Sequence, residues 1–114
     1  MPKDGAVDYI ELPASDIPAT KAFYAAAFGW SFTDYGPDYV AFAFEGREGG
    51  FNAERKVIGN GGPLLVLYAN DLDAMENKVR SLGAEITDRQ EFTGGRRFHF
   101  RDPNGNEIAV WTKG

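Results

Sequence analysis

Cysteine is missing altogether from this sequence, and histidine occurs once, at His99. Without thiols the chain has no disulfide, no thiolate nucleophile and no sulfur ligands for a zinc ribbon or an iron–sulfur cluster. No apolar run approaches the ~20 residues that cross a bilayer. The first five residues, Met-Pro-Lys-Asp-Gly, also lack the apolar segment of a signal peptide. We therefore expect a cytoplasmic protein with no membrane partner.

Positive charge is also scarce. The 114 residues include 12 Lys and Arg against 17 Asp and Glu, which gives a net charge of −5. A protein that binds duplex nucleic acid needs a basic stripe to neutralise phosphates. The dense basic spots here are only Arg96-Arg97 with Arg101, and Arg55-Lys56. These few basic residues are enough to bind one small anion, and their small number predicts that nucleic acid is not a partner.

The residues that are present predict two helices, each with an acidic cap and a glycine stop. Asp16 is placed to cap a helix that carries Pro18 in its first turn and runs to Phe28, where Gly29 ends it. Asp71 is placed to cap a second helix, which Gly83 ends. The second helix is expected to present one apolar face, made by Leu72, Met75, Val79 and Leu82.

Around these helices the strand pattern repeats. Each glycine-stopped helix is followed by a Thr-Asp pair, at Thr33-Asp34 and Thr87-Asp88, and the strand, cap, helix and stop recur in the same order. The sequence therefore predicts an α+β fold in a single domain, 1–114, made of two β-α-β-β-β modules at 1–58 and 63–114 with a linker at 59–62. Strands are expected at 7–13, 30–35, 39–45, 50–55, 64–69, 84–89, 96–101 and 107–112.

Several short motifs resemble those of a known group. They are Glu11-Leu-Pro-Ala-Ser-Asp16, Phe23-Tyr24, Phe28-Gly29-Trp30, Leu82-Gly83-Ala84 and Arg101-Asp-Pro-Asn-Gly-Asn106. In this order they resemble the vicinal oxygen chelate superfamily, which holds glyoxalase I, bleomycin and fosfomycin resistance proteins and extradiol dioxygenases. The chain looks most similar to short proteins related to lactoylglutathione lyase. The resemblance implies that the two modules form a cupped mixed β-sheet, and that the protein is a homodimer.

The resemblance also implies positions for a divalent metal, held by His or Glu side chains on the strands of the cup. The first of these positions falls on Tyr9, the second on Leu64 and the last on Ala109, while the remaining one lies somewhere in 50–52. Leucine and alanine have no donor atom, and such a site needs three or four nitrogen or oxygen ligands. We therefore expect no metal and no cofactor.

Strand alternation predicts which side chains face the cup. The hairpin at 102–106 is expected to pair Arg101 with Glu107, His99 with Ala109, and Arg97 with Trp111. Arg101 and Glu107 would then form a cross-strand salt bridge. The predicted ligand-binding residues are Tyr9, Glu11, Tyr68, Arg97, Glu107 and Trp111, with Leu64, Val66, His99, Arg101 and Ala109 on the same face.

Two kinds of residue keep alternative interpretations. His99 would act as a general acid or base with Glu11 or Glu107 as its partner, or it would be a hydrogen-bonding residue that lines the pocket. Arg97 would hold an anionic ligand. The aromatic residues either line a groove for a flat ligand or form core. These are Trp30, Phe42, Phe44, Phe51, Tyr68 and Trp111.

Three functions are consistent with this sequence. The first is a glyoxalase- or bleomycin resistance-like protein that binds a small molecule in its cup without the usual metal. The second is a lyase or isomerase that uses His99, or a displaced metal site made by His99, Glu107, Glu11 and Tyr9. The third is a regulatory or interaction module with a vestigial pocket. Whether the protein is an enzyme is left open by the sequence.

Overall fold

The computed structural model describes residues 3–114, which form two compact units. The first unit ends at Val57 and the second begins at Ile58. The first contains β1 (Ile10–Pro13), α1 (Ile17–Phe28), β2 (Ser31–Asp34), β3 (Tyr39–Phe44) and β4 (Arg47–Asn52). The second contains β5 (Leu65–Tyr68), α2 (Leu72–Ser81), β6 (Glu85–Phe92), β7 (Gly95–Arg101) and β8 (Glu107–Lys113).

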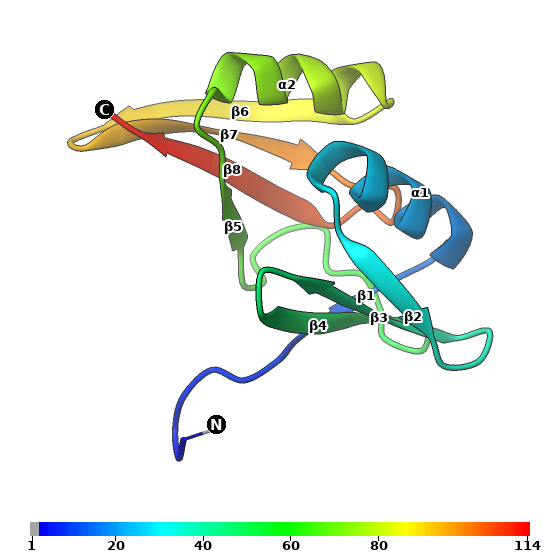
Figure 1. Ribbon diagram of the computed structural model, residues 1–114. Helices are drawn as coiled ribbons and strands as arrows, with labels where there is room; N and C mark the ends of the chain where they lie inside the picture. Colours follow the sequence, from blue (N-terminus) through cyan, green and yellow to red (C-terminus); the bar gives the residue numbers. More distant parts are fainter. Residues whose placement is uncertain (1–2) are drawn as a thin grey trace. The chain divides into compact units, whose positions relative to one another are not determined.

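Each unit is a β-α-β-β-β module with one four-stranded mixed sheet (Figure 1). The strand orders are β1-β4-β3-β2 and β5-β8-β7-β6. In both, the first and last strands of the module are parallel and the other neighbours are antiparallel. The predicted α+β class with two repeated modules is therefore confirmed.

Both helices begin where their acidic caps predict. The Asp16 carboxylate accepts a hydrogen bond from the Ala19 N–H at 2.9 Å, and Asp71 accepts one from the Ala74 N–H at 3.0 Å. Each carboxylate satisfies a backbone donor that has no partner inside the helix. Gly29 ends α1 in the left-handed region, with a φ of 75°. The expected apolar face of α2 is wrong at its last position, because Leu82 is 41% exposed.

The core of the first unit is a stack of aromatic rings between α1 and its sheet. Tyr24 of α1 stacks on Trp30 at 4.6 Å between ring centroids, and Trp30 stacks on Phe42 at 4.3 Å. Phe51 lies against both Tyr24 and Phe42 and is fully buried. For Trp30, Phe42 and Phe51 the core interpretation is therefore correct. Burial of each such ring stabilises the fold by about 1.5–3 kcal/mol.

In the second unit α2 lies along one face of the sheet (Figure 1). The strand residues that alternate with the predicted cup-facing ones are buried: Phe98, Phe100, Ile108 and Val110. Two ion pairs join α2 to the strands, from Arg89 to Glu76 at 2.6 Å and from Arg96 to Asp73 at 2.9 Å. The hydrogen bond from Arg89 lowers the pKa of Glu76. These contacts hold α2 on one face of the sheet.

β1 begins three residues later than predicted, β4 lies three residues earlier at both ends and β6 ends three residues later, while the other strand ends agree within one residue. The predicted turn at 46–49 is shorter, because Glu45 and Gly46 both take positive φ values, of 51° and 77°, and β4 begins at Arg47. β6 continues to Phe92 and contains a register shift between Ile86 and Asp88. Among residues 3–114, no helix is long and apolar enough to cross a membrane.

Candidate ligand-binding site

The pairing of the strands shows which residues lie on the face of the second sheet opposite α2. The predicted pairs Arg97 with Trp111, His99 with Ala109, and Arg101 with Glu107 are all confirmed. Paired residues point to the same face of a sheet. Together with the pairings of β5 and β6, this gives one row made of Tyr68, Trp111, Arg97 and Gln90, and a second row made of Val66, Ala109, His99 and Asp88.

His99 and Glu107 form the closest polar pair on this face. His99 is 5% exposed, and its Nδ1 lies 2.7 Å from Oε2 of Glu107. The two residues lie diagonally, because the residue opposite His99 is Ala109, whose methyl group leaves room for the Glu107 side chain. An ionised carboxylate only accepts hydrogen bonds, so Nδ1 donates when Glu107 is ionised, and Nε2 then has a lone pair in the neutral form of the ring.

The other nitrogen of this ring, Nε2 of His99, is buried and has no hydrogen-bond partner within the described residues. Leaving a buried acceptor unsatisfied costs about 1–3 kcal/mol. Such an atom is a candidate for contact with a bound molecule. The sequence indicated His99 as a pocket residue, and the structure shows it paired with Glu107, one of the two partners predicted for it.

The predicted salt bridge between Arg101 and Glu107 is wrong. The two residues are opposite each other, but no ion pair joins them in the part of the chain that the structure describes. Glu107 turns toward His99, and Arg101 instead donates to the carbonyl oxygens of Gly59 and Gly105. The acceptor at Gly59 is 42 residues away in the sequence, so strand register alone could not predict it.

A hydrogen-bonded chain runs across the edge of the same face. Arg97 Nε donates to Oε1 of Gln90 at 3.0 Å, and Nε2 of Gln90 donates to Oδ2 of Asp88 at 2.8 Å. This second bond lowers the pKa of Asp88, helped by the backbone N–H of Arg89 and the nearby charges of His99 and Arg97, and opposed by partial desolvation. Asp88 is therefore an ionised neighbour of the site.

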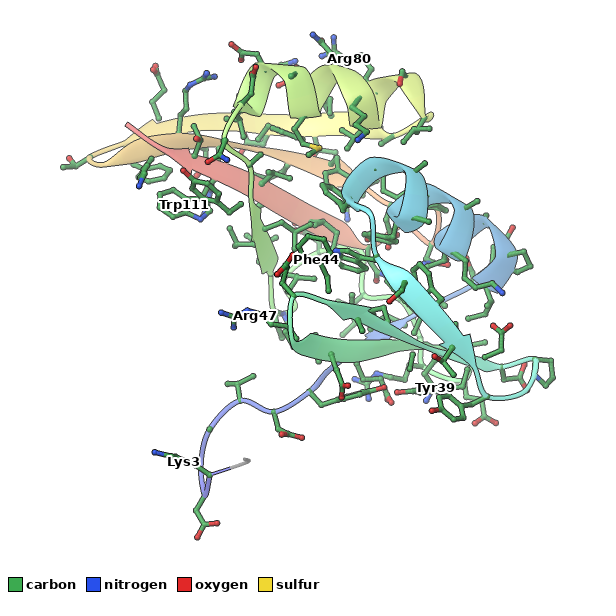
Figure 2. All side chains as sticks on the ribbon, in the orientation of Figure 1. Lys3, Tyr39, Phe44, Arg47, Arg80 and Trp111 are labelled. Carbon is green, nitrogen blue, oxygen red and sulfur yellow. The ribbon has the colours of Figure 1, made fainter. Side chains whose placement is uncertain are left out.

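Three aromatic rings gather at the end of this face. Tyr68 packs edge-on against Trp111 at 5.2 Å between centroids, and Phe92 lies at 6.5 Å from Trp111. Tyr68 and Phe92 are 43% and 44% exposed. Figure 2 shows Trp111 on the side of the sheet away from α2. The groove interpretation of the aromatic residues is therefore retained for Tyr68 and Trp111.

The first unit has a different polar cluster on the face away from α1, where Figure 2 shows Tyr39. The hydroxyls of Tyr9 and Tyr39 lie 2.8 Å apart. Asn52 donates to Glu11 at 3.3 Å, and Arg55 lies 3.7 Å from the same carboxylate. Burial raises the pKa of Tyr39, and so do its hydrogen bonds to Tyr9 and Glu11.

Gly50 explains how the two tyrosines reach each other. A Cβ atom at this position would lie 2.2 Å from the hydroxyl oxygen of Tyr39 and 2.6 Å from that of Tyr9. Atoms at these distances overlap, so the phenol groups occupy the space that a side chain would need. The sequence named Tyr9 and Glu11 for this face and missed Tyr39 and Asn52. Alternation along 39–45 was the signal that could have included Tyr39.

The repeated register also resolves the uncertain metal position within 50–52. Glu11 pairs with Gly50 in the first sheet, as Val66 pairs with Ala109 in the second, so Gly50 is the counterpart of Ala109. The four positions implied by the resemblance are then Tyr9, Gly50, Leu64 and Ala109. Three of them have no donor atom, and the hydroxyl of Tyr9 bonds to Tyr39. These residues do not fit a divalent ion held in that way.

Among residues 3–114 no group of three or more His, Cys, Asp or Glu side chains is arranged to hold a metal ion. The displaced site would draw Tyr9 and Glu11 from the first unit and His99 and Glu107 from the second, and it stays a prediction. The sequence reasoning also missed Asp88, Gln90 and Phe92. The register shift before Asp88 decides which side chains of β6 point to the face opposite α2, and the sequence pattern does not show that shift.

Two repeated β-α-β-β-β modules, each with a helix on one sheet face and polar and aromatic residues on the other, are the architecture of one broad superfamily of proteins. The sequence model of the Glyoxalase/Bleomycin resistance protein/Dioxygenase superfamily matches residues 6–110. The chain belongs to this superfamily.

Individual relatives differ in what their names describe. An anthracycline biosynthesis protein, DauV from Streptomyces sp. (strain C5), is 31% identical over 96% of this chain and 48% of its own length. The chain thus spans about half the length of the curated relatives it matches. The lactoylglutathione lyase from Agrobacterium tumefaciens is 21% identical, with a TM-score of 0.76 over 96% of this chain and 95% of that one. TnmS3, an antibiotic binding protein from Streptomyces sp. CB03234, is 22% identical, with a TM-score of 0.76 over 96% and 97%.

Proposed function

We propose that this chain binds a small organic molecule without a divalent metal, on the sheet faces opposite the two helices. The observation that carries the proposal is the filling of the Gly50 position by the hydroxyls of Tyr9 and Tyr39. Where the resemblance places a ligand for a metal, this chain has glycine under a hydrogen-bonded pair of phenols. At its counterpart Ala109, the neighbouring His99 and Glu107 contact each other.

Each unit offers its own candidate contacts on the sheet face opposite its helix. Tyr9 and Glu11 supply polar groups in the first unit, and the second unit supplies Tyr68, Arg97, Glu107 and Trp111. Sites for small molecules are mostly apolar, with a few polar groups that fix the orientation of the ligand, and the second unit has both kinds of group on one face. The names of DauV and TnmS3, which describe antibiotic biosynthesis and antibiotic binding, support an organic ligand for this chain.

Elemental analysis and ligand screening test the proposal together. Protein purified without chelators is expected to contain far less than one divalent ion per chain, and EDTA should leave its melting temperature unchanged. Small organic molecules, but not Zn, Ni, Mn or Fe, should raise that temperature, because a ligand that binds only the folded state stabilises it. About one metal ion per chain, removed by EDTA with loss of stability, would refute the metal-free part.

A second candidate function is a lyase or isomerase that uses His99. The observation in its favour is the 2.7 Å contact between Glu107 and Nδ1, which leaves Nε2 as an acceptor without a partner. This is the arrangement of a general base held by a carboxylate. Because Nε2 is buried, it must become accessible before a substrate proton can reach it. His99→Gln should abolish turnover of a substrate found in the screen while the melting temperature of the variant stays near that of the wild type.

Two further expectations belong to the proposal, namely that the protein forms a homodimer and that it acts in the cytoplasm. Light scattering on the purified chain measures the first directly. Fractionation of cells that express it measures the second.

A further inference from the structure

The face of the second sheet opposite α2 carries a row of side chains that changes from aromatic to cationic. Across the four strands the row reads Tyr68, Trp111, Arg97 and Gln90, and Phe92 lies beside Trp111. Single exposed aromatic residues are common on protein surfaces, but a group of them marks a place where something binds. Here Tyr68 and Phe92 remain more than two-fifths exposed although both lie against Trp111.

The guanidinium of Arg97 is oriented and only partly used. Its Nε donates to Gln90, which is itself held by Asp88. Within residues 3–114, no acceptor is bonded to the two terminal amino groups of Arg97. A guanidinium fixed through Nε presents these two groups as a planar fork, which fits the two oxygens of a carboxylate. Because Gln90 already restricts the side chain, binding an anion would cost little further ordering.

We propose that this row binds a planar aromatic compound that carries a carboxylate or a similar anionic oxygen group. The ring lies on Trp111 between Tyr68 and Phe92, and the anionic oxygens accept hydrogen bonds from Arg97. This inference rests on the proposed function and adds the chemical class of the ligand. It places the ring and the charge on neighbouring strands.

Strand spacing sets the size of such a ligand. Neighbouring strands are about 4.8 Å apart, so Trp111 and Arg97 are separated by about 5 Å across the sheet, and Tyr68 and Arg97 by about 10 Å. One ring or two fused rings span this distance, with the anionic group at one end.

Two negative charges face the same region, and both already have donors. Asp88 accepts from Gln90 and from the backbone N–H of Arg89, and Glu107 accepts from His99. Both carboxylates weaken the attraction for an anion, but neither is bonded to the fork of Arg97. The ring must therefore contribute much of the affinity, and the fork contributes the selectivity for anions.

Isothermal titration of the full chain with three related probes tests this inference. The probes are 2-naphthoate, its neutral analogue 2-naphthamide, and decahydronaphthalene-2-carboxylate, which keeps the charge and loses the aromatic plane. We expect 2-naphthoate to bind with a dissociation constant of about 1 mM or lower. The other two probes should bind at least about fivefold more weakly, because each lacks one of the two contacts.

Arg97→Gln has a matched control in Arg96→Gln. Arg96 is the next residue on the same strand, but it points to the opposite face, where it pairs with Asp73. Arg97→Gln should weaken 2-naphthoate by about tenfold, the loss expected for one charge-assisted hydrogen bond. It should leave 2-naphthamide within about twofold. Arg96→Gln should change neither. Trp111→Leu should weaken both aromatic probes.

The inference is overturned if the saturated carboxylate binds as well as 2-naphthoate, if Arg97→Gln weakens both aromatic probes equally, or if 2-naphthoate does not bind at millimolar concentration. In each case, a different ligand that raises the melting temperature of the metal-free protein would leave the proposed function standing. If no organic compound of any class does so, both are refuted.

Discussion

Two adjacent glycines of β4, Gly49 and Gly50, offer a sharp test of how the first unit is packed. They point to opposite faces of the sheet, and both leave no space for a Cβ atom. At Gly49 a Cβ would lie 2.3 Å from a ring carbon of Phe42 and 2.4 Å from the backbone oxygen of Ile10. At Gly50 the three nearest atoms to a Cβ belong to the ends of Tyr39 and Tyr9. Alanine at position 49 therefore places its methyl group against atoms that cannot move, whereas at position 50 the nearest atoms can move.

The magnitudes follow from what each neighbour can do. Phe42 is stacked on Trp30 at 4.3 Å and cannot retreat, and the Ile10 oxygen is part of the parallel sheet. Gly49→Ala should therefore destabilise the protein by about 3 kcal/mol, the upper part of the range for overpacked cores. At Gly50 the two phenols can swing toward solvent and lose one hydrogen bond, which costs about 1 kcal/mol. Loss of glycine flexibility in the unfolded chain offsets part of that cost, so Gly50→Ala should cost at most about 1 kcal/mol.

Urea denaturation followed by circular dichroism measures both variants. A third comparison isolates the cause. In a Tyr39→Leu background, which removes the nearest hydroxyl, the cost of Gly50→Ala should disappear, whereas the cost of Gly49→Ala should persist. Equal costs for the two glycines in the wild-type background would refute the reasoning, as would a cost at Gly50 that does not depend on Tyr39.

The remaining predictions concern the turn after β7 and the ionisation of Tyr39. Asp102 is buried and accepts hydrogen bonds from the backbone N–H groups of Asn104 and Asn106, each at 2.9 Å. Asp102→Ala should therefore lower the free energy of unfolding by about 2–4 kcal/mol. A urea midpoint equal to that of the wild type would contradict this role. The pKa of Tyr39 is raised by burial and by its hydrogen bonds to Tyr9 and Glu11. The protonated phenol therefore favours the folded state, and this contribution is complete below the ordinary pKa of about 10 and is lost as pH rises toward the raised value. Urea midpoints measured between about pH 9 and pH 11 should fall less steeply for Tyr39→Phe than for the wild type, and parallel slopes would argue against the shift.

The sequence predicted well the features that depend on neighbouring residues. Asp16 and Asp71 cap the helices because the bond from a capping carboxylate spans only three residues. The pairing of Arg97, His99 and Arg101 with the last strand was also correct. A tight turn fixes the register of the hairpin that it closes, and the turn at 102–106 is evident in the sequence.

Features that depend on distant residues were missed. Gly49 looked like part of a turn, yet it is a strand residue, because the ring of Phe42 fills the place of its side chain. The salt bridge expected for Arg101 was wrong, since a carbonyl in the segment before β5 and a turn carbonyl take its donors. The sequence offered two carboxylates, Glu11 and Glu107, as partners of His99. The structure pairs His99 with Glu107, and the small side chain of Ala109 explains how Glu107 reaches the ring.

The pair of tyrosine hydroxyls above Gly50 also bears on how the site could change during evolution. A single substitution that places a carboxylate or imidazole at this position meets both phenols at once, so it lowers stability before it offers a metal any benefit. Tyr39 or Tyr9 would have to shrink first, and Leu64 and Ala109 would each need a replacement of their own. The order of mutations therefore matters. Under the metal-free proposal, building a metal site at these four positions would take several substitutions in this chain.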